Sequence, residues 1–234
     1  MTDAEFDFGA RVRQAMSAEP SPRRTEMRRL GEAMRQVIER LVGTKAPLEA
    51  LAVAADELER VAAALAEYPQ GRTMEGFAES ANSGDPHAFF DHSPIIGRSN
   101  PLAPPVELEV RDGKVYGRAV YGSAYEGPPA SVHGGYVAAA FDEVLGMTQS
   151  MSGNPGMTGT LTVKYRSPTP LHTELRFEGT LERVEGRKIF TSGRLFAGDR
   201  LCAEAEAIFI SVDFRKFAEL MARQGRPPAG SDPG

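Results

Sequence analysis

The segment SVHGGYVAAAFDEVLG, residues 131 to 146, places a His-Gly-Gly tripeptide at the start of an apolar run that contains two acids. If the run is a helix that begins at the glycines, its free N–H groups and its dipole favour negative charge there. Glycine at positions 134 and 135 lets a substrate approach the backbone closely. The Gly134 amide beside His133 could therefore stabilise a carbonyl oxygen that gains negative charge. The alternative is that Gly134 and Gly135 only relieve crowding between a loop and the helix.

Asp142 is the second reactive group in this segment. A carboxylate inside an apolar helix is unfavourable unless it is paired or takes part in chemistry, although Asp142 and Glu143 could also lie on a solvent-facing side. Asp142 follows His133 by nine residues, which is about 13 Å along a helix. One carbonyl cannot contact both ends of that span. The two groups can share a substrate only if Asp142 comes from a second chain, which predicts an obligate dimer.

The segments around this helix predict an antiparallel sheet. Before the helix, VELEV and KVYGRAVYG flank the turn RDG, which is typical of a hairpin. Four strand-like segments follow the helix: MTGTLTVKYRSP, LRFEGTLERV, KIFTSGRLF and LCAEAEAIFISV. The last three are joined by the tight turns EGR and AGD. A helix that is apolar all round is a buried helix, so we expect an α+β domain in which the sheet wraps around it.

The first third of the chain predicts a helical arm. Apolar residues recur every three or four positions from 25 to 42 and again from 48 to 65. Ser21 is the expected N-cap of the first helix, with Pro22 in its first turn, and the short connection predicts an antiparallel hairpin. Residues 22 to 67 contain eight basic and eight acidic residues, mostly segregated by helix, which favours mutual attraction over DNA binding. The arm has no catalytic cluster, so we expect it to be dispensable for chemistry.

The expected organisation has four parts. Residues 1–80 form the N-terminal helical arm, and 81–105 form a linker. Residues 106–213 form the sheet domain, and 214–234 form a C-terminal helix and a disordered tail. The linker is rich in Gly, Pro, Ser and Asn, but its apolar residues predict that part of it packs: Phe89, Phe90, Ile95 and Ile96.

Composition narrows the class of protein further. The net charge of -5 and the pI of about 5.5 argue against a dedicated nucleic-acid binder. The single cysteine, Cys202, excludes an internal disulfide and is expected to be a packed strand residue in a reducing cytoplasm. The N-terminus has no apolar signal region, and no apolar run is long enough to span a membrane. We therefore expect a soluble cytoplasmic protein.

Three motifs together carry a family resemblance: HGGYVAAAFDEVLG, MTGTLTVKYRSPTPL and AEAEAIFISV. They resemble the hotdog-fold acyl-CoA thioesterases, in particular the branch that contains the phenylacetic-acid-pathway (PaaI-like) and THEM-type enzymes. The resemblance covers about residues 93 to 212 and leaves the arm outside. It implies a hotdog fold, a homodimer or a dimer of dimers, and hydrolysis of an acyl-CoA to free acid and coenzyme A without a cofactor.

The resemblance also implies a role for each motif position. The Gly134 amide, oriented by His133, would polarise the thioester carbonyl. Asp142 of the partner chain would act as nucleophile or as general base toward water, and both versions remain open. Thr158 matches the family threonine that hydrogen-bonds the acid or the attacking water. The motif contains a second acid, Glu143. It lies about 100° around the helix from Asp142, so the two carboxylates cannot both point at one carbonyl.

Coenzyme A carries phosphates, which call for cations at the mouth of the site. The candidates are Arg166, Arg187 and Lys188, for each of which an ordinary solvated charge is the alternative. His87 and His92 have no further ligand at a suitable spacing, so we expect no metal site.

Two other functions remain as alternatives. A non-enzymatic acyl-CoA-binding protein would not need Asp142, and a hotdog dehydratase or hydratase would pair a histidine with an acid in a different pattern.

Overall fold

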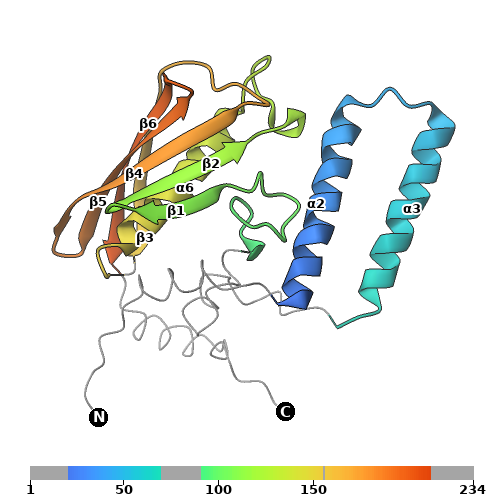
Figure 1. Cartoon of the computed structure of the whole chain (residues 1–234), viewed down its shortest axis with the longest axis horizontal. Helices are drawn as coiled ribbons and strands as arrows, with labels where there is room; N and C mark the ends of the chain where they lie inside the picture. Colours follow the sequence, from blue (N-terminus) through green and yellow to red (C-terminus); the bar gives the residue numbers. More distant parts are fainter. Residues whose placement is uncertain (1–20, 70–90, 155, 212–234) are drawn as a thin grey trace, which may run out of the picture.

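The computed structural model describes residues 21–69, 91–154 and 156–211 (Figure 1). Its elements are α2 (Pro22–Gly43), α3 (Leu48–Ala66), β1 (Glu107–Arg111), β2 (Lys114–Val120), the 3-10 turn η1 (Ser123–Tyr125), α6 (Gly134–Ser150), β3 (Gly156–Tyr165), β4 (Glu174–Glu185), β5 (Lys188–Ala197) and β6 (Arg200–Ser211). The predicted order of two strands, one helix and four strands is confirmed. The predictions for His87, Phe89, Phe90 and the C-terminal helix fall outside the described residues.

The six strands form one antiparallel sheet in the order β1-β2-β4-β5-β6-β3. Three connections turn at glycines with positive φ, namely Gly113, Gly186 and Gly198, where a side chain would be strained. Strands β1 and β3 are the two edges. Among the described residues, β3 pairs only with β6, so the other edge of this ten-residue strand is open. No helix of the described ranges is long and apolar enough to cross a membrane.

The sheet curves around α6, which is the predicted hotdog arrangement (Figure 1). The helix approaches the sheet closely because glycines lie beneath it. A Cβ at Gly179 would collide with Thr148 Oγ1, and one at Gly193 would lie 3.1 Å from a Leu145 methyl group. Phe141 of α6 meets Phe177 of β4 edge to face, with ring centroids 5.4 Å apart. These contacts fix how deeply α6 sits in the sheet.

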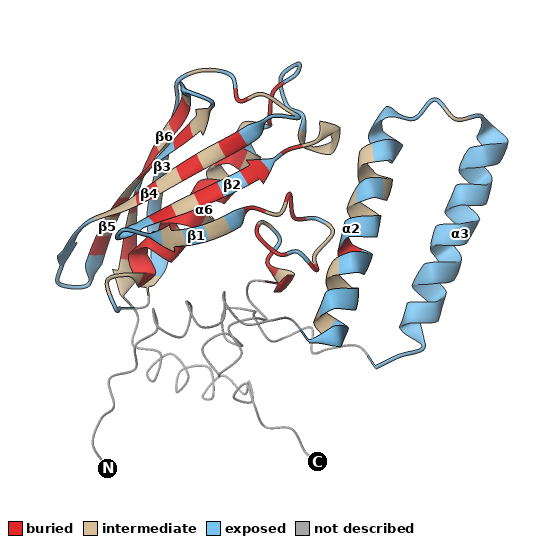
Figure 2. Cartoon of the chain, in the orientation of Figure 1, coloured by how far each residue is buried: buried red, intermediate tan, exposed pale blue. Residues whose placement is uncertain are grey.

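One prediction about α6 is wrong in part, because the helix is not buried on all sides within one chain. The side that faces the sheet is buried, including Val137, Phe141 and Val144, whereas Ala138, Ala139, Asp142 and Gly146 are half-exposed (Figure 2). A single sheet covers only one side of a helix. The half-exposed side is apolar apart from its acid, so it is available to pack against a further surface.

Among the described residues of the arm, α2 contacts the sheet domain at η1. As predicted, Ser21 caps α2 by accepting a 3.3 Å hydrogen bond from the Arg24 amide. Glu39 accepts hydrogen bonds from the Ser123 and Ala124 amides at 2.9 and 3.2 Å, which joins α2 to η1. Burial alone would raise the pKa of Glu39, but these hydrogen bonds and the nearby His172 outweigh it, so the pKa is lowered.

Helix α3 runs antiparallel beside α2, as expected, but no residue of α3 is buried (Figure 2). Its apolar stripe stays exposed, for example at Leu48, which is 76% exposed, and Leu65, which is 48% exposed. Within the described ranges, the ion pairs of the arm form inside one helix or between α2 and the loop at residue 91, and none joins α2 to α3. The predicted attraction between the two helices is therefore absent from this part of the chain.

Candidate active site

His133 lies at the exposed start of α6. It is the N-cap residue, and its Nδ1 accepts a 3.0 Å hydrogen bond from the Gly135 amide, while its carbonyl accepts from the Tyr136 amide at 2.9 Å. The amide of His133 in turn donates to the Tyr125 carbonyl at 2.9 Å, which ties the cap to the loop after β2. The histidine thus orients the first turn of the helix.

The Gly134 amide is the remaining donor of that first turn. It makes no hydrogen bond within residues 21–69, 91–154 and 156–211, whereas the next three amides all bond to His133. An unpaired amide at the positive end of a helix dipole favours an anionic oxygen. This geometry matches the oxyanion-type donor that the sequence predicted.

Tyr165, at the end of β3, is a site residue that the sequence analysis missed. Its hydroxyl donates a 2.8 Å hydrogen bond to the Gly134 carbonyl. A Cβ at Gly134 would lie 3.1 Å from the same hydroxyl, so Tyr165 closes one side of the glycine turn. The strand alternation placed Tyr165 at the end of β3, but nothing local indicated which helix residue it would meet.

Asp142 and Thr158 form the second half of the site. Thr158 Oγ1 donates a 2.7 Å hydrogen bond to Asp142 Oδ1. A β-bulge between Thr158 and Thr160 interrupts the pairing of β3 with β6 at this point. A bulge changes the direction in which a side chain points, and here the exposed Thr158 points toward α6. The carboxylate is held in one orientation on the half-exposed side of α6.

One half of the site lies at the start of α6 and the end of β3, and the other lies at the middle of α6 and near the start of β3. Eight residues separate Gly134 from Asp142, which is about 12 Å along the helix axis. Seven residues separate Thr158 from Tyr165, which is about 23 Å along an extended strand. Within one chain, therefore, the amide and the carboxylate cannot act on the same carbonyl.

Glu143 lies beside Asp142 but does not point into the same half-site. Its Oε1 accepts a 2.8 Å hydrogen bond from the Ser93 hydroxyl in the loop before β1. Burial raises the pKa of Glu143 to about 7, the nearby charge of Asp142 adds to the rise, and the Ser93 hydrogen bond opposes it. From the sequence we expected Glu143 to point away from the reacting carbonyl. In the structure its carboxylate binds the Ser93 hydroxyl.

The three candidate phosphate-binding cations do not meet within one chain. Arg166 follows β3 at the end where Tyr165 pairs with Ala203, and its guanidinium bonds Glu204 at 2.8 Å. Arg187 and Lys188 lie at the opposite end of the sheet, where Arg187 donates to the Ser211 carbonyl at 3.2 Å. One phosphate cluster formed by all three side chains therefore requires more than one chain.

Two further predictions concern groups outside this site. Cys202 is fully buried in β6, as expected for a packed strand residue. Among the residues that the structure describes, no group of three or more His, Cys, Asp or Glu side chains could hold a metal ion.

Comparisons with known proteins place this chain among thioesterase sequences. The family model described as "Thioesterase superfamily" matches residues 130–204, from the loop before His133 into β6. The acyl-coenzyme A thioesterase THEM4 of Xenopus laevis is 38% identical over 93 residues, which are 39% of this chain and 42% of that protein. THEM4 of Mus musculus is 37% identical over 93 residues, which are 39% of this chain and 40% of that protein. The chain thus spans about two-fifths of the length of these curated relatives.

A solved structure extends the match beyond the site. The crystal structure of a thioesterase superfamily protein is 35% identical to this chain, with a TM-score of 0.71, and the match covers 79% of this chain and 94% of that one. The similarity therefore spans nearly all of a solved relative. Together with the hotdog sheet and helix described above, it shows that this chain belongs to the thioesterase superfamily.

Proposed function

We propose that this protein hydrolyses acyl-coenzyme A thioesters to a free acid and coenzyme A, in an active site formed by two chains. The observation that carries the proposal is the division of the site. The unpaired Gly134 amide lies at the start of α6, and the Asp142 carboxylate bonded to Thr158 lies two turns further along the helix, at its middle. An oxyanion donor and an acid of this kind suit attack on a thioester carbonyl.

The reaction can follow either of two routes. In the first, the Asp142 carboxylate takes a proton from water, the water oxygen bonds to the carbonyl carbon, and the C–S bond breaks to release a thiol after protonation. In the second, Asp142 itself bonds to the carbonyl carbon, the thiol leaves, and water hydrolyses the resulting anhydride. In both routes the carbonyl oxygen gains negative charge opposite the Gly134 amide, and Thr158 holds the carboxylate.

Two features support a two-fold partner along β3. In the part of the chain that the structure describes, one edge of this strand is open as a template for pairing with a second copy, and no element covers the half-exposed side of α6. Antiparallel pairing that brings Thr158 of one chain to Tyr165 of the partner subunit puts the axis between Leu161 and Thr162. Gly134 of one chain then lies near the Asp142 end of the partner's helix, which completes the site.

The same two-fold arrangement gathers the candidate cations. Arg166 of one chain would lie toward the end of the sheet that carries Arg187 and Lys188 of the partner subunit. Coenzyme A phosphates at this mouth would meet guanidinium and ammonium groups from both chains. The names of the curated relatives support an acyl-CoA substrate. The single buried cysteine supports a cytoplasmic location.

The first test measures free thiol released from a panel of acyl-CoA substrates. We expect turnover of at least one substrate and a loss of about 100-fold or more in Asp142→Asn, because this change removes the charge and keeps the shape. Asp199→Asn, at the exposed turn between β5 and β6, is the matched control and should retain activity. A folded Asp142→Asn protein with near-normal rates would contradict the assignment. Tight acyl-CoA binding without thiol release would favour the binding-protein alternative.

The second test asks whether the site is shared. Asp142→Ala and Gly134→Pro are each expected to be inactive, because one lacks the acid and the other lacks the amide hydrogen. After subunit exchange, a heterodimer contains one site with both intact groups, so activity should return. Absence of recovery, with exchange confirmed by native mass spectrometry, would contradict a composite site.

A further inference from the structure

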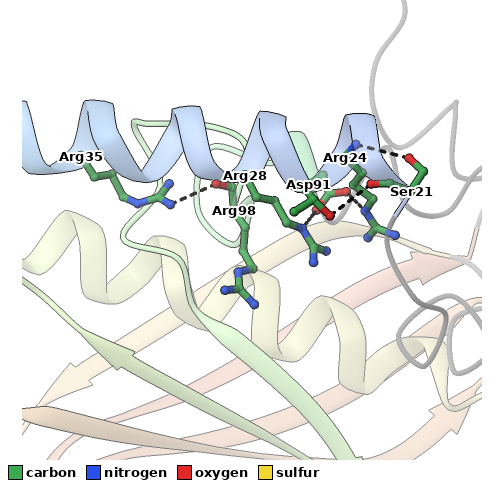
Figure 3. Close-up of polar contacts among 7 residues, drawn as sticks. Ser21, Arg24, Arg28, Arg35, Asp91 and Arg98 are labelled. Carbon is green, nitrogen blue, oxygen red and sulfur yellow. Dashed lines mark hydrogen bonds and ion pairs between the residues drawn. The ribbon is translucent and has the colours of Figure 1, made fainter.

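The loop that precedes β1 connects the helical arm to the catalytic helix. Its first described residue, Asp91, has a side chain that is only 5% exposed, and the Arg24 and Arg28 guanidinium groups of α2 both bind it (Figure 3). Further along α2, Arg35 donates to the carbonyls of Arg98 and Asn100, each at 3.0 Å. Helix α2 therefore holds both ends of the loop 91–100.

Hydrogen bonds within the loop and close contacts with α2 restrict the loop further. The Ser99 amide donates to the Asp91 carbonyl at 2.8 Å, and the Gly97 amide donates to the Ser93 carbonyl at 3.0 Å. A Cβ at Gly97 would collide with the Ser93 carbonyl, and one at Gly31 of α2 would lie 2.7 Å from the Arg98 carbonyl. These contacts leave little room for the loop to move.

Ser93 points from this rigid loop to α6. Its Oγ accepts hydrogen bonds from the Ile95 and Ile96 amides, both at 3.2 Å, so its own hydrogen is directed outward. That hydrogen is donated to Glu143, the neighbour of Asp142 in the chain. A continuous series of contacts thus runs from the arm to the residue next to the catalytic acid.

We propose that Glu143 is a positioning residue of the hydrolysis reaction: held by Ser93, its ionised carboxylate places a second negative charge beside Asp142 and accelerates the step in which Asp142 loses its own charge. Asp142 loses that charge in either route, by taking a proton from water or by bonding to the carbonyl carbon. Repulsion between the two carboxylates is relieved in that step, which lowers the barrier. This inference rests on the proposed thioesterase function.

Glu143 suits this role because it changes charge near neutral pH. Burial raises its pKa to about 7, and the charge of Asp142 contributes to the rise. The groups that act on it are Asp142 from α6 and the Ser93 hydroxyl from the loop. The carboxylate of Asp91 binds Arg24 and Arg28 of α2, and His92 is the histidine of the same loop. We expect activity to rise with pH as Glu143 ionises.

The test is the pH profile of kcat/KM for thiol release between pH 5.5 and 8.5. We expect the wild-type value to rise through pH 7 as Glu143 ionises, and the ratio of the high-pH value to the low-pH value measures the interaction between the two acids. Glu143→Gln keeps an acceptor for Ser93 but cannot ionise. Its profile should lose the rise and stay near the low-pH value of the wild type. His92→Gln is the control and should keep the rise.

Ser93→Ala provides an independent variant. It removes the hydrogen bond that lowers the pKa of Glu143, so the rise should move to higher pH rather than disappear. A purely structural role for Glu143 or Ser93 would lower activity without changing the shape or the position of the profile. A rise that persists in Glu143→Gln, or that stays in place in Ser93→Ala, would overturn the inference.

The outcomes also separate this inference from the proposed function. If the wild-type protein releases no thiol from any acyl-CoA, the proposed function fails and this inference fails with it. If the wild type is active and depends on Asp142, but its profile is flat through pH 7, only the role of Glu143 is overturned.

Discussion

The buried Glu143 should make the stability of the folded protein fall as pH rises, and Glu143→Gln should abolish that effect. The pKa of this carboxyl is about 7 in the folded protein, against an ordinary value of 4.5. Because the folded state binds this proton more tightly, the stabilisation is complete below pH 4.5 and is lost as pH rises through 7. The rise from 4.5 to about 7, at about 1.4 kcal/mol for each pH unit, amounts to about 3.5 kcal/mol.

Glutamine is neutral at every pH and can accept the Ser93 hydrogen bond that Glu143 accepts at 2.8 Å. The variant should therefore match the wild type near pH 5 and exceed its free energy of unfolding by up to about 3.5 kcal/mol at pH 8. Urea denaturation at the two pH values measures this difference, with size-exclusion chromatography to show that the oligomer is unchanged. Glu174→Gln, at an exposed position at the start of β4, is the control and should leave the pH dependence unaltered.

The same slope of stability against pH in the wild type and in Glu143→Gln would refute the reasoning, because it would show that Glu143 is ionised in the folded protein well below pH 7. A gain in stability at pH 8 with a loss of thioesterase activity would have a clear physical meaning. The charge beside Asp142 would then be retained for catalysis at a cost to folding.

Two further results are expected. Thr158→Val removes the 2.7 Å hydrogen bond to Asp142 and should lower kcat/KM for thiol release by about tenfold or more, because the acid loses its orientation. An unchanged rate in a folded variant would argue against Thr158 as an orienting group. Glu39→Ala leaves the Ser123 and Ala124 amides without their acceptor and should lower the free energy of unfolding by about 1–2 kcal/mol at pH 7. Because the pKa of Glu39 is lowered in the folded state, its contribution is present above its ordinary pKa and should diminish as pH falls toward 4, which urea denaturation at pH 7 and pH 4 can check.

The structure adds contacts of the arm that its composition did not indicate. Residues 22 to 67 contain no catalytic cluster, and that the arm is dispensable for chemistry stays a prediction. Helix α2 binds the loop whose Ser93 contacts Glu143. Contacts between residues 50 to 67 positions apart leave no local pattern in the sequence, so composition could not indicate them.

Local interactions determined what the sequence could predict. The Ser21 and His133 caps, the strand alternation and the turns at Gly113, Gly186 and Gly198 each depend on a few neighbouring residues. They were therefore visible as spacing and composition. The reactive acid was visible for a similar reason, because a carboxylate within an apolar helix stands out from its neighbours.

Tertiary structure decided which of these groups meet. The register of β3 against α6 brings Tyr165 to Gly134 and Thr158 to Asp142, and the bulge at Thr158 contributes to that aim. The direction of the strands separates Arg166 from Arg187, because Tyr165 pairs with Ala203 toward one end of β6 and Lys188 pairs with Ile210 at the other. Register, sheet order and helix depth depend on packing across the whole domain. The sequence by itself therefore determined the reactive groups of this protein, whereas only the fold decided their partners.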